Sequence, residues 1–176
     1  MDIPVDYCIF TKNGIMIQRE FQVAYREYAG IEELSPELAG LVKRAREITG
    51  KAYSPYSGFQ VGAAVLLANG AVICGNNQEN AAYPSGLCAE RTALFYANAN
   101  YPDIPVVALA ISAANSRGRV KEPVKPCGSC RQVILESEAR FGQPVQIILD
   151  GLNGIHVFDG IDNLLPFSFK PASLNG

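Results

Sequence analysis

Apolar residues recur with helical spacing after residue 35. Ser35 is a good N-cap residue and Pro36 suits the first helical position. From there to Gly50, apolar residues stand three or four positions apart, which predicts an amphipathic helix. Two further segments, 88–99 and 128–140, are also expected to be helical. Short apolar runs predict strands at 61–67, 71–74, 106–113, 145–149 and 155–158.

The order of these segments predicts the fold class. Strands separated by helices favour an α/β protein with a mixed β-sheet of about five strands covered by helices. Most connections are short, and a turn is expected at Asn69-Gly70. After the last strand, residues 162–169 are expected to begin as a short helix or turn. We therefore expect one main domain over residues 35–176.

Residues 1–34 are expected to form an N-terminal extension. Apolar runs at 8–10 and 15–17 flank Lys12-Asn13-Gly14, and Asn-Gly between apolar runs is typical of a β-hairpin. A strand-like stretch at 21–25 follows. The extension could add strands, cap the domain or alter assembly.

Composition narrows the function classes. Apolar residues make up 48% of the chain, and 15 basic residues nearly balance 17 acidic ones, for a formal charge of −2. Such a balance argues against a dedicated nucleic-acid binder. No apolar run reaches the roughly 18 residues of a membrane span, and the N-terminus lacks the layout of a signal peptide. We therefore expect a cytoplasmic protein.

The cysteines are the first candidates for chemistry. There are five, and His156 is the single histidine, expected at the surface or an interface. In a reducing compartment, spaced cysteines more often bind metal or react than form disulfides. A metal site must then use thiolates or carboxylates. Cys8 and Cys74 are expected to be inert and apolar.

Two cysteine motifs stand at the starts of predicted helices. Cys127 and Cys130 have the spacing that clamps one ion, and Cys88 adds a third sulfur. Three protein ligands leave an open position, as in catalytic zinc sites. Helix N-termini also favour thiolates. Glu90, two residues after Cys88, could carry the proton of a water acidified by zinc, a combination typical of zinc deaminases.

Four motifs resemble those of the cytidine deaminase family, in its small homotetrameric form with three zinc cysteines. Residues 53–64 resemble the family's opening motif and residues 75–84 its ribose segment. Residues 88–91 and 126–132 resemble its metal segments. With Leu164-Leu165-Pro166, the resemblance runs from about Ser35 to about Phe169. It implies a three-layer α/β/α catalytic domain over residues 35–176.

The resemblance also implies roles for individual residues. Cys88, Cys127 and Cys130 would hold one Zn²⁺ per subunit, with Glu90 as the catalytic proton carrier. Asn77 and Glu79 would bind the ribose hydroxyls, and Arg91 would offset the charge of the thiolates. The other substrate contacts implied are Phe59 at the base, Ala89 through its backbone, and Tyr83 and Phe169, which in tetrameric members reach a neighbouring subunit's site.

The expected activity is hydrolytic deamination of cytidine and 2'-deoxycytidine in pyrimidine salvage, with a small nucleoside as the partner and no membrane or nucleic acid. One alternative is deamination of a related aminopyrimidine nucleoside such as blasticidin S. Another is a non-catalytic zinc module that binds a partner protein. Polynucleotide editing is a third, and the acidic balance counts against it.

Overall fold

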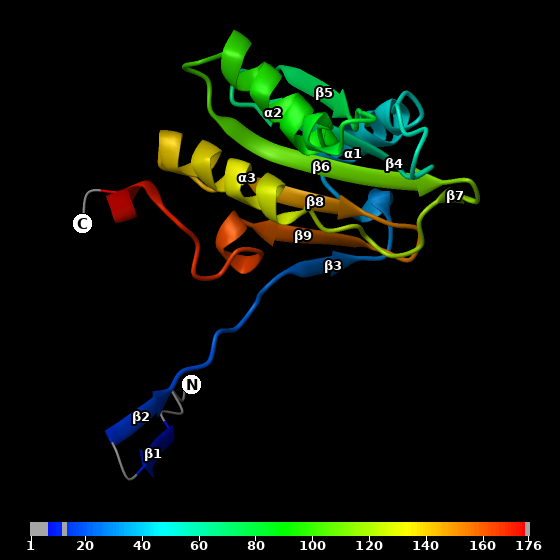
Figure 1. The fold of residues 1–176 in the computed structure, drawn as a ribbon. Helices are drawn as coiled ribbons and strands as arrows, with labels where there is room; N and C mark the ends of the chain where they lie inside the picture. The colour runs from blue at the N-terminus through cyan, green and yellow to red at the C-terminus, as the bar shows by residue number, and fades with distance from the viewer. Residues whose placement is uncertain (1–6, 12–13, 175–176) are drawn as a thin grey trace.

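The computed structural model describes residues 7–11 and 14–174. Its main part is a seven-stranded mixed sheet with the order β3-β9-β8-β6-β4-β5, and β7 pairs with β6 (Figure 1). The β6–β8 pair is parallel and the other pairs are antiparallel. The strands are β3 (Arg26–Tyr28), β4 (Gln60–Leu67), β5 (Val72–Asn76), β6 (Val106–Asn115), β7 (Gly118–Arg119), β8 (Gln146–Asp150) and β9 (Ile155–Asp159).

Helices cover both faces of this sheet. Alternate residues of a strand point to opposite faces, and β4 follows that rule. Its Ala64 and Leu66 pack with buried residues of α1 (Pro36–Thr49). The intervening β4 residues pack with α2 (Ala89–Asn100) and α3 (Gly128–Phe141). The α/β fold with a mixed sheet between helix layers is confirmed, and the five expected strands are adjacent in it, in the order β9-β8-β6-β4-β5.

Residues at the helix N-termini correctly predicted where the helices begin. The Ser35 hydroxyl accepts a hydrogen bond from the Leu38 amide at 3.4 Å, as expected for the first residue before α1. Cys88 and Cys127 occupy the N-cap positions of α2 and α3. None of the helices in the described residues is long and apolar enough to cross a membrane.

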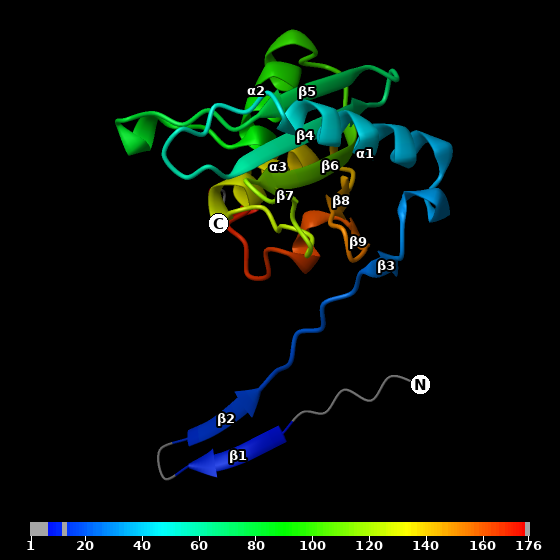
Figure 2. The same ribbon diagram turned by 90° about the vertical axis from the view of Figure 1, so that its right-hand side faces the viewer.

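The N-terminal segment contains both a confirmed and a wrong prediction. The hairpin is present as β1 (Tyr7–Thr11) and β2 (Gly14–Gln18), whereas the turn residues 12–13 lie outside the described residues. Figure 2 shows this hairpin set apart from the sheet. The strand expected at 21–25 is wrong, because that segment has no ladder partner and the strand begins at Arg26.

The register of β3 explains this difference. Arg26 lies opposite Val157, so only two residues of β9 remain beyond that pair. At Gly160 a φ of +86° turns the chain away from the sheet. By this register residues 21–23 lie beyond the end of β9, so a strand over 21–25 could not be paired along its length. His156 on β9 is largely covered, with 14% of its side chain exposed and its ring 4.8 Å from that of Tyr25.

Candidate metal centre and substrate pocket

The three expected metal ligands come together at the N-termini of two helices. Cys88 precedes α2, Cys127 precedes α3, and Cys130 lies in the first turn of α3. The Cys127 sulfur is 3.8 Å from that of Cys88 and 3.5 Å from that of Cys130. All three sulfurs lie within 4.8 Å of one another.

These separations fit a zinc ion. A Zn–S bond is about 2.3 Å long, so two sulfurs on a tetrahedral zinc are about 3.8 Å apart. The two measured distances, 3.8 and 3.5 Å, are close to that value. Both helix N-termini also direct the positive ends of their dipoles toward the sulfurs, which favours thiolates. The donor set is therefore suited to zinc by both chemistry and spacing.

The three sulfurs are not electrostatically equivalent. A hydrogen bond with Cys130 is the main cause that lowers the pKa of the Cys88 thiol to about 5, and the Arg91 guanidinium adds to it. The Arg91 Nη2 is 3.7 Å from the Cys88 sulfur. The same Cys88 contact, together with burial, raises the pKa of Cys130. The Cys88 thiol is thus more acidic than that of Cys130.

Glu90 is a buried acid beside these sulfurs. It lies in the first turn of α2 and is 5% exposed. Burial raises the pKa of its carboxyl, and the charge of Cys88 raises that pKa further. A carboxyl whose pKa is moved toward neutrality can both accept and donate a proton during turnover. The geometry therefore combines a metal-binding cluster with a proton carrier.

Asn77 uses its side chain to hold the start of β4. Its Oδ1 accepts from the Val61 amide at 2.7 Å, and its Nδ2 donates to the Phe59 carbonyl at 2.9 Å. An amide group has a second lone pair on oxygen and a second N–H. Asn77 therefore retains one acceptor and one donor while it fixes the backbone next to Phe59.

Glu79 holds the backbone of the turn before β4, at residues 56–57. Its carboxylate accepts from the Ser57 hydroxyl at 2.5 Å and from the amides of Tyr56 and Ser57 at 2.8 and 3.3 Å. The Ser57 hydroxyl is the main cause that lowers the pKa of Glu79, and the Tyr56 amide contributes. Glu79 is thus a charged acceptor anchored to the turn before β4.

A cavity of about 330 Å³ connects these two groups with the cysteine cluster. This volume falls within the range of roughly 300–1,000 Å³ typical of small-molecule sites. Asn77, Glu79 and Tyr83 line it together with Cys88 and Arg91. The candidate ribose contacts therefore share one cavity with Cys88, the first of the candidate metal ligands.

Residues 37–141 match the family model for the zinc-binding region of cytidine and deoxycytidylate deaminases. The chain belongs to this deaminase family. A cytidine deaminase of Halalkalibacterium halodurans is 42% identical over 135 residues, which are 77% of this chain and 96% of that protein. One of Sporosarcina psychrophila is 41% identical over 133 residues, 76% of this chain and 89% of that protein.

Solved structures give the same relationship. The crystal structure of a cytidine deaminase from Burkholderia pseudomallei matches with a TM-score of 0.63 at 38% identity. The match covers 74% of this chain and 97% of that one. That of Mycobacterium tuberculosis matches with a TM-score of 0.58 at 31% identity, covering 77% and 98%. The α/β deaminase fold therefore spans nearly the whole length of these relatives.

The other predicted substrate-binding residues of this deaminase differ in how far they are buried. Ala89 is fully buried and Phe59 partly buried. Tyr83 lines the cavity and is 78% exposed, with its ring centroid 6.2 Å from that of Tyr56 and the two rings nearly perpendicular. Phe169 is 60% exposed and is not among the residues lining the cavity. Within one chain, the structure does not bring Phe169 to the other site residues.

Sequence reasoning missed Arg131 and Gln132, which follow the last cysteine. The Arg131 Nε donates to the Pro126 carbonyl at 2.8 Å and its Nη1 donates to the Leu164 carbonyl at 2.5 Å. Gln132 donates to the Phe169 carbonyl at 2.9 Å. The signal available was their place inside the metal motif, but their backbone partners are too distant in sequence to be predicted.

Proposed function

We propose that this chain is a zinc-dependent cytidine deaminase that hydrolyses cytidine and 2'-deoxycytidine to uridine and 2'-deoxyuridine, releasing ammonia. The observation that carries this proposal is the buried Glu90 beside three sulfurs spaced for zinc. The relatives named cytidine deaminase support the substrate class. A role in pyrimidine salvage in the cytoplasm is part of the proposal, supported by thiols suited to a reducing compartment.

Cys88, Cys127 and Cys130 would hold one zinc ion per subunit. When bound, zinc supplies a Lewis acid that brings the pKa of a coordinated water toward neutrality. Three thiolates leave a charge of −1 on such a site, which opposes that acidity. Arg91, 3.7 Å from the Cys88 sulfur, offsets part of this charge.

Glu90 would move the protons of the reaction. Water adds to C4 of the pyrimidine ring while the Glu90 carboxylate accepts one of its protons. Glu90 then delivers a proton to N3 and assists the transfer that turns the amino group into ammonia. The C4–N bond breaks and C4 keeps the oxygen. Burial suits Glu90 to this exchange because a raised pKa makes its carboxyl an effective acid as well as a base.

The cavity would select a nucleoside. Glu79 and Asn77 face it, and a charged carboxylate makes strong hydrogen bonds to sugar hydroxyls. Phe59 would pack against the base, and the Ala89 backbone would contact its polar edge. Tyr83 and Phe169 would contribute across the interfaces of a homotetramer, whose size light scattering would measure.

Glu90→Gln tests the catalytic assignment. The variant should fold and bind zinc like the wild type and lose nearly all turnover of cytidine, followed by ultraviolet absorbance. Glu37→Gln is the matched control, since Glu37 is an exposed acid in the first turn of α1. Substantial activity in Glu90→Gln would contradict the role of Glu90.

Further measurements separate the alternatives. Chelation should abolish turnover and added zinc should restore it. Preferential turnover of blasticidin S over cytidine would replace the proposed substrate. A zinc-loaded wild type with no turnover of either compound would instead support a non-catalytic zinc module.

A further inference from the structure

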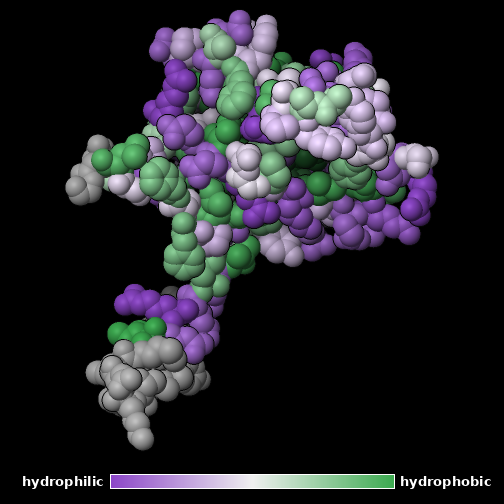
Figure 3. Space-filling model, in the orientation of Figure 1, coloured by the Kyte–Doolittle hydropathy of each residue, from purple (hydrophilic) through white to green (hydrophobic). Residues whose placement is uncertain are grey.

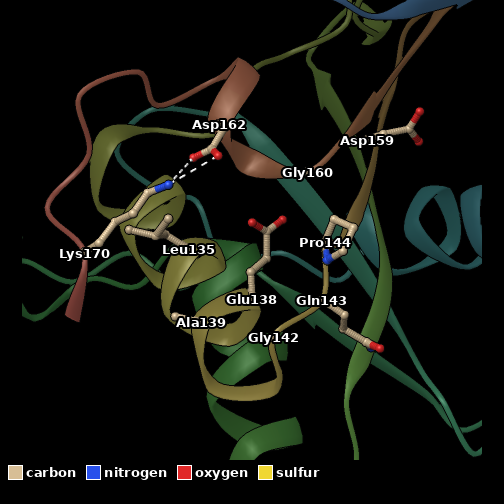
Figure 4. A pocket seen from close by; sticks show the side chains of 10 residues that line it. All are labelled: Leu135, Glu138, Ala139, Gly142, Gln143, Pro144, Asp159, Gly160, Asp162 and Lys170. Atoms are coloured by element: carbon tan, nitrogen blue, oxygen red, sulfur yellow. Dashed lines mark hydrogen bonds and ion pairs between the residues drawn. The ribbon is translucent and has the colours of Figure 1, made fainter. Parts of the chain in front are cut away.

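The segment 161–170, here called the C-terminal loop, is closed at its base. Glu138 of α3 accepts a hydrogen bond from the Ile161 amide at 2.9 Å. Lys170 pairs with the Asp162 carboxylate, with its Nζ 3.0 Å from one oxygen (Figure 4). The start of the loop is therefore held against α3, and its two ends are held to each other.

The C-terminal loop is also bound to the end of the metal motif on α3. Arg131 binds the Leu164 carbonyl and, with the same guanidinium, the Pro126 carbonyl beside Cys127. Gln132 binds the Phe169 carbonyl. These contacts connect the backbone on both sides of the loop's tip to the helix that carries two of the cysteines.

The tip of the loop has an unusual backbone. Phe167 has a φ of +57°, the only positive φ at a non-glycine residue in the described part of the chain. A bulky side chain seldom adopts this left-handed conformation unless surrounding contacts impose it. The Phe167 side chain is 98% exposed, and its ring lies 6.4 Å from that of Phe21. Phe21 and the tip of the loop also line one cavity, so Phe21 is positioned to support the tip.

Phe21 belongs to residues 19–28, here called the N-terminal arm, which precede the family-matched residues 37–141. The arm is fixed to the end of the sheet. The Ala24 amide donates to the Asn163 Oδ1 at 3.0 Å, and the Tyr25 ring stacks on Phe158 at 5.2 Å. Figure 3 shows apolar surface where the arm leaves the domain.

We propose that the N-terminal arm is a positioning element of the deaminase: it holds the C-terminal loop against α3 and thereby sets the position of Phe169. This inference rests on the proposed function only through the substrate role of Phe169. The arm contacts the loop at two places, its base at Asn163 and its tip at Phe167. Without the arm, the loop would lose these two contacts and keep its hydrogen bonds to α3 and the Lys170–Asp162 pair.

Phe21→Ala in the full chain tests the hold directly. Hydrogen exchange followed by mass spectrometry should be faster in peptides covering residues 161–170. Val23→Ala is the matched control, because Val23 is 52% exposed beside 50% for Phe21 and does not line the cavity between Phe21 and the loop. Phe21→Tyr keeps the ring and should restore wild-type exchange. Unchanged exchange in Phe21→Ala would overturn the proposal, whether or not the protein turns over cytidine.

Kinetic measurements test whether the contact between the arm and the C-terminal loop affects substrate binding. An aromatic contact of this kind corresponds to a change in KM of about threefold to tenfold in Phe21→Ala. Zinc content and kcat should stay near wild type, since the arm does not touch the metal cluster. Phe21→Tyr and Val23→Ala should keep the wild-type KM. Faster loop exchange with an unaltered KM would show that the arm braces the loop without positioning Phe169, and would refute the inference.

Discussion

Replacing Arg91 with alanine should weaken zinc binding. Its guanidinium lies 3.7 Å from the Cys88 sulfur, one helical turn away on α2. Hydrogen bonds to charged groups contribute roughly 1.5–3 kcal/mol. Arg91 is only partly buried, so screening by solvent moves the expected loss to the lower end of that range. We therefore expect a zinc dissociation constant at least about tenfold higher in Arg91→Ala.

Arg91→Lys distinguishes the charge from the shape of the side chain. Lysine keeps a positive charge as a compact ammonium, whereas arginine presents several N–H donors in a planar fork. The lysine variant should therefore bind zinc with an affinity between those of wild type and Arg91→Ala. The Arg91 Nε is buried without a hydrogen-bond partner in the described structure, so the fork is already incompletely used.

Competition with a chromophoric chelator measures these affinities. Turnover of cytidine at saturating zinc then reports any separate effect on catalysis. Arg44→Ala is the control, because Arg44 is an exposed helical arginine paired with Glu47 on the surface of α1. Zinc binding in Arg91→Ala as tight as in the wild type would refute the idea that Arg91 stabilises the thiolates.

Three other predictions concern the scaffold. Asp150 is fully buried and accepts hydrogen bonds from the Arg46 Nη2 and Nε at 2.7 and 2.9 Å, so Asp150→Ala should cost about 3–5 kcal/mol, a fall in Tm of at least about 6 °C by calorimetry. Burial raises the pKa of Glu138, so the folded state binds more protons than the unfolded state and stability falls as the pH rises through that region. Glu138→Gln removes this loss of stability at higher pH. Urea denaturation should show the free energy of unfolding of the variant, relative to that of wild type, increasing between about pH 4 and about pH 7. No such increase would contradict the effect of burial on the pKa of Glu138. A Cβ at Gly75 would lie 2.6 Å from backbone of α2, so Gly75→Ala should lower both stability and zinc affinity, whereas Gly40→Ala, with open space in a helix interior, should add about 0.5–1 kcal/mol.

The parts of the fold that were predicted correctly depend on local sequence. A capping serine followed by proline located the start of α1, and apolar runs located the five strands β4, β5, β6, β8 and β9. The two short strands escaped prediction for a different reason. β3 exists because residues 26–28 meet the free edge of β9, and β7 because two residues fold back on β6. Neither pairing leaves a periodic pattern in its own segment.

In the candidate site too, local sequence predicted some features, whereas others depend on tertiary packing. The spacing of Cys127 and Cys130, together with Cys88 at a second helix start, predicted a cluster, and the three sulfurs do lie within 4.8 Å of one another. The burial of Glu90 could not be obtained from its position in the motif, because it depends on how α2 packs against the rest of the domain. The hydrogen bond from Arg131 to the Leu164 carbonyl could not be predicted either, because it joins residues 33 positions apart.

Asn77 and Glu79 illustrate what sequence resemblance leaves out. Their motif suggested ribose contacts, yet their side chains also hold the backbone of Phe59 and of the turn at Ser57. A side chain held in place before a ligand arrives loses less conformational freedom on binding, and this lowers the cost of association. The proposed ribose contacts would therefore be pre-organised by the same hydrogen bonds that connect β5 to the start of β4. A substitution at Asn77 or Glu79 should then alter the shape of the base pocket as well as the hydrogen bonds to the sugar.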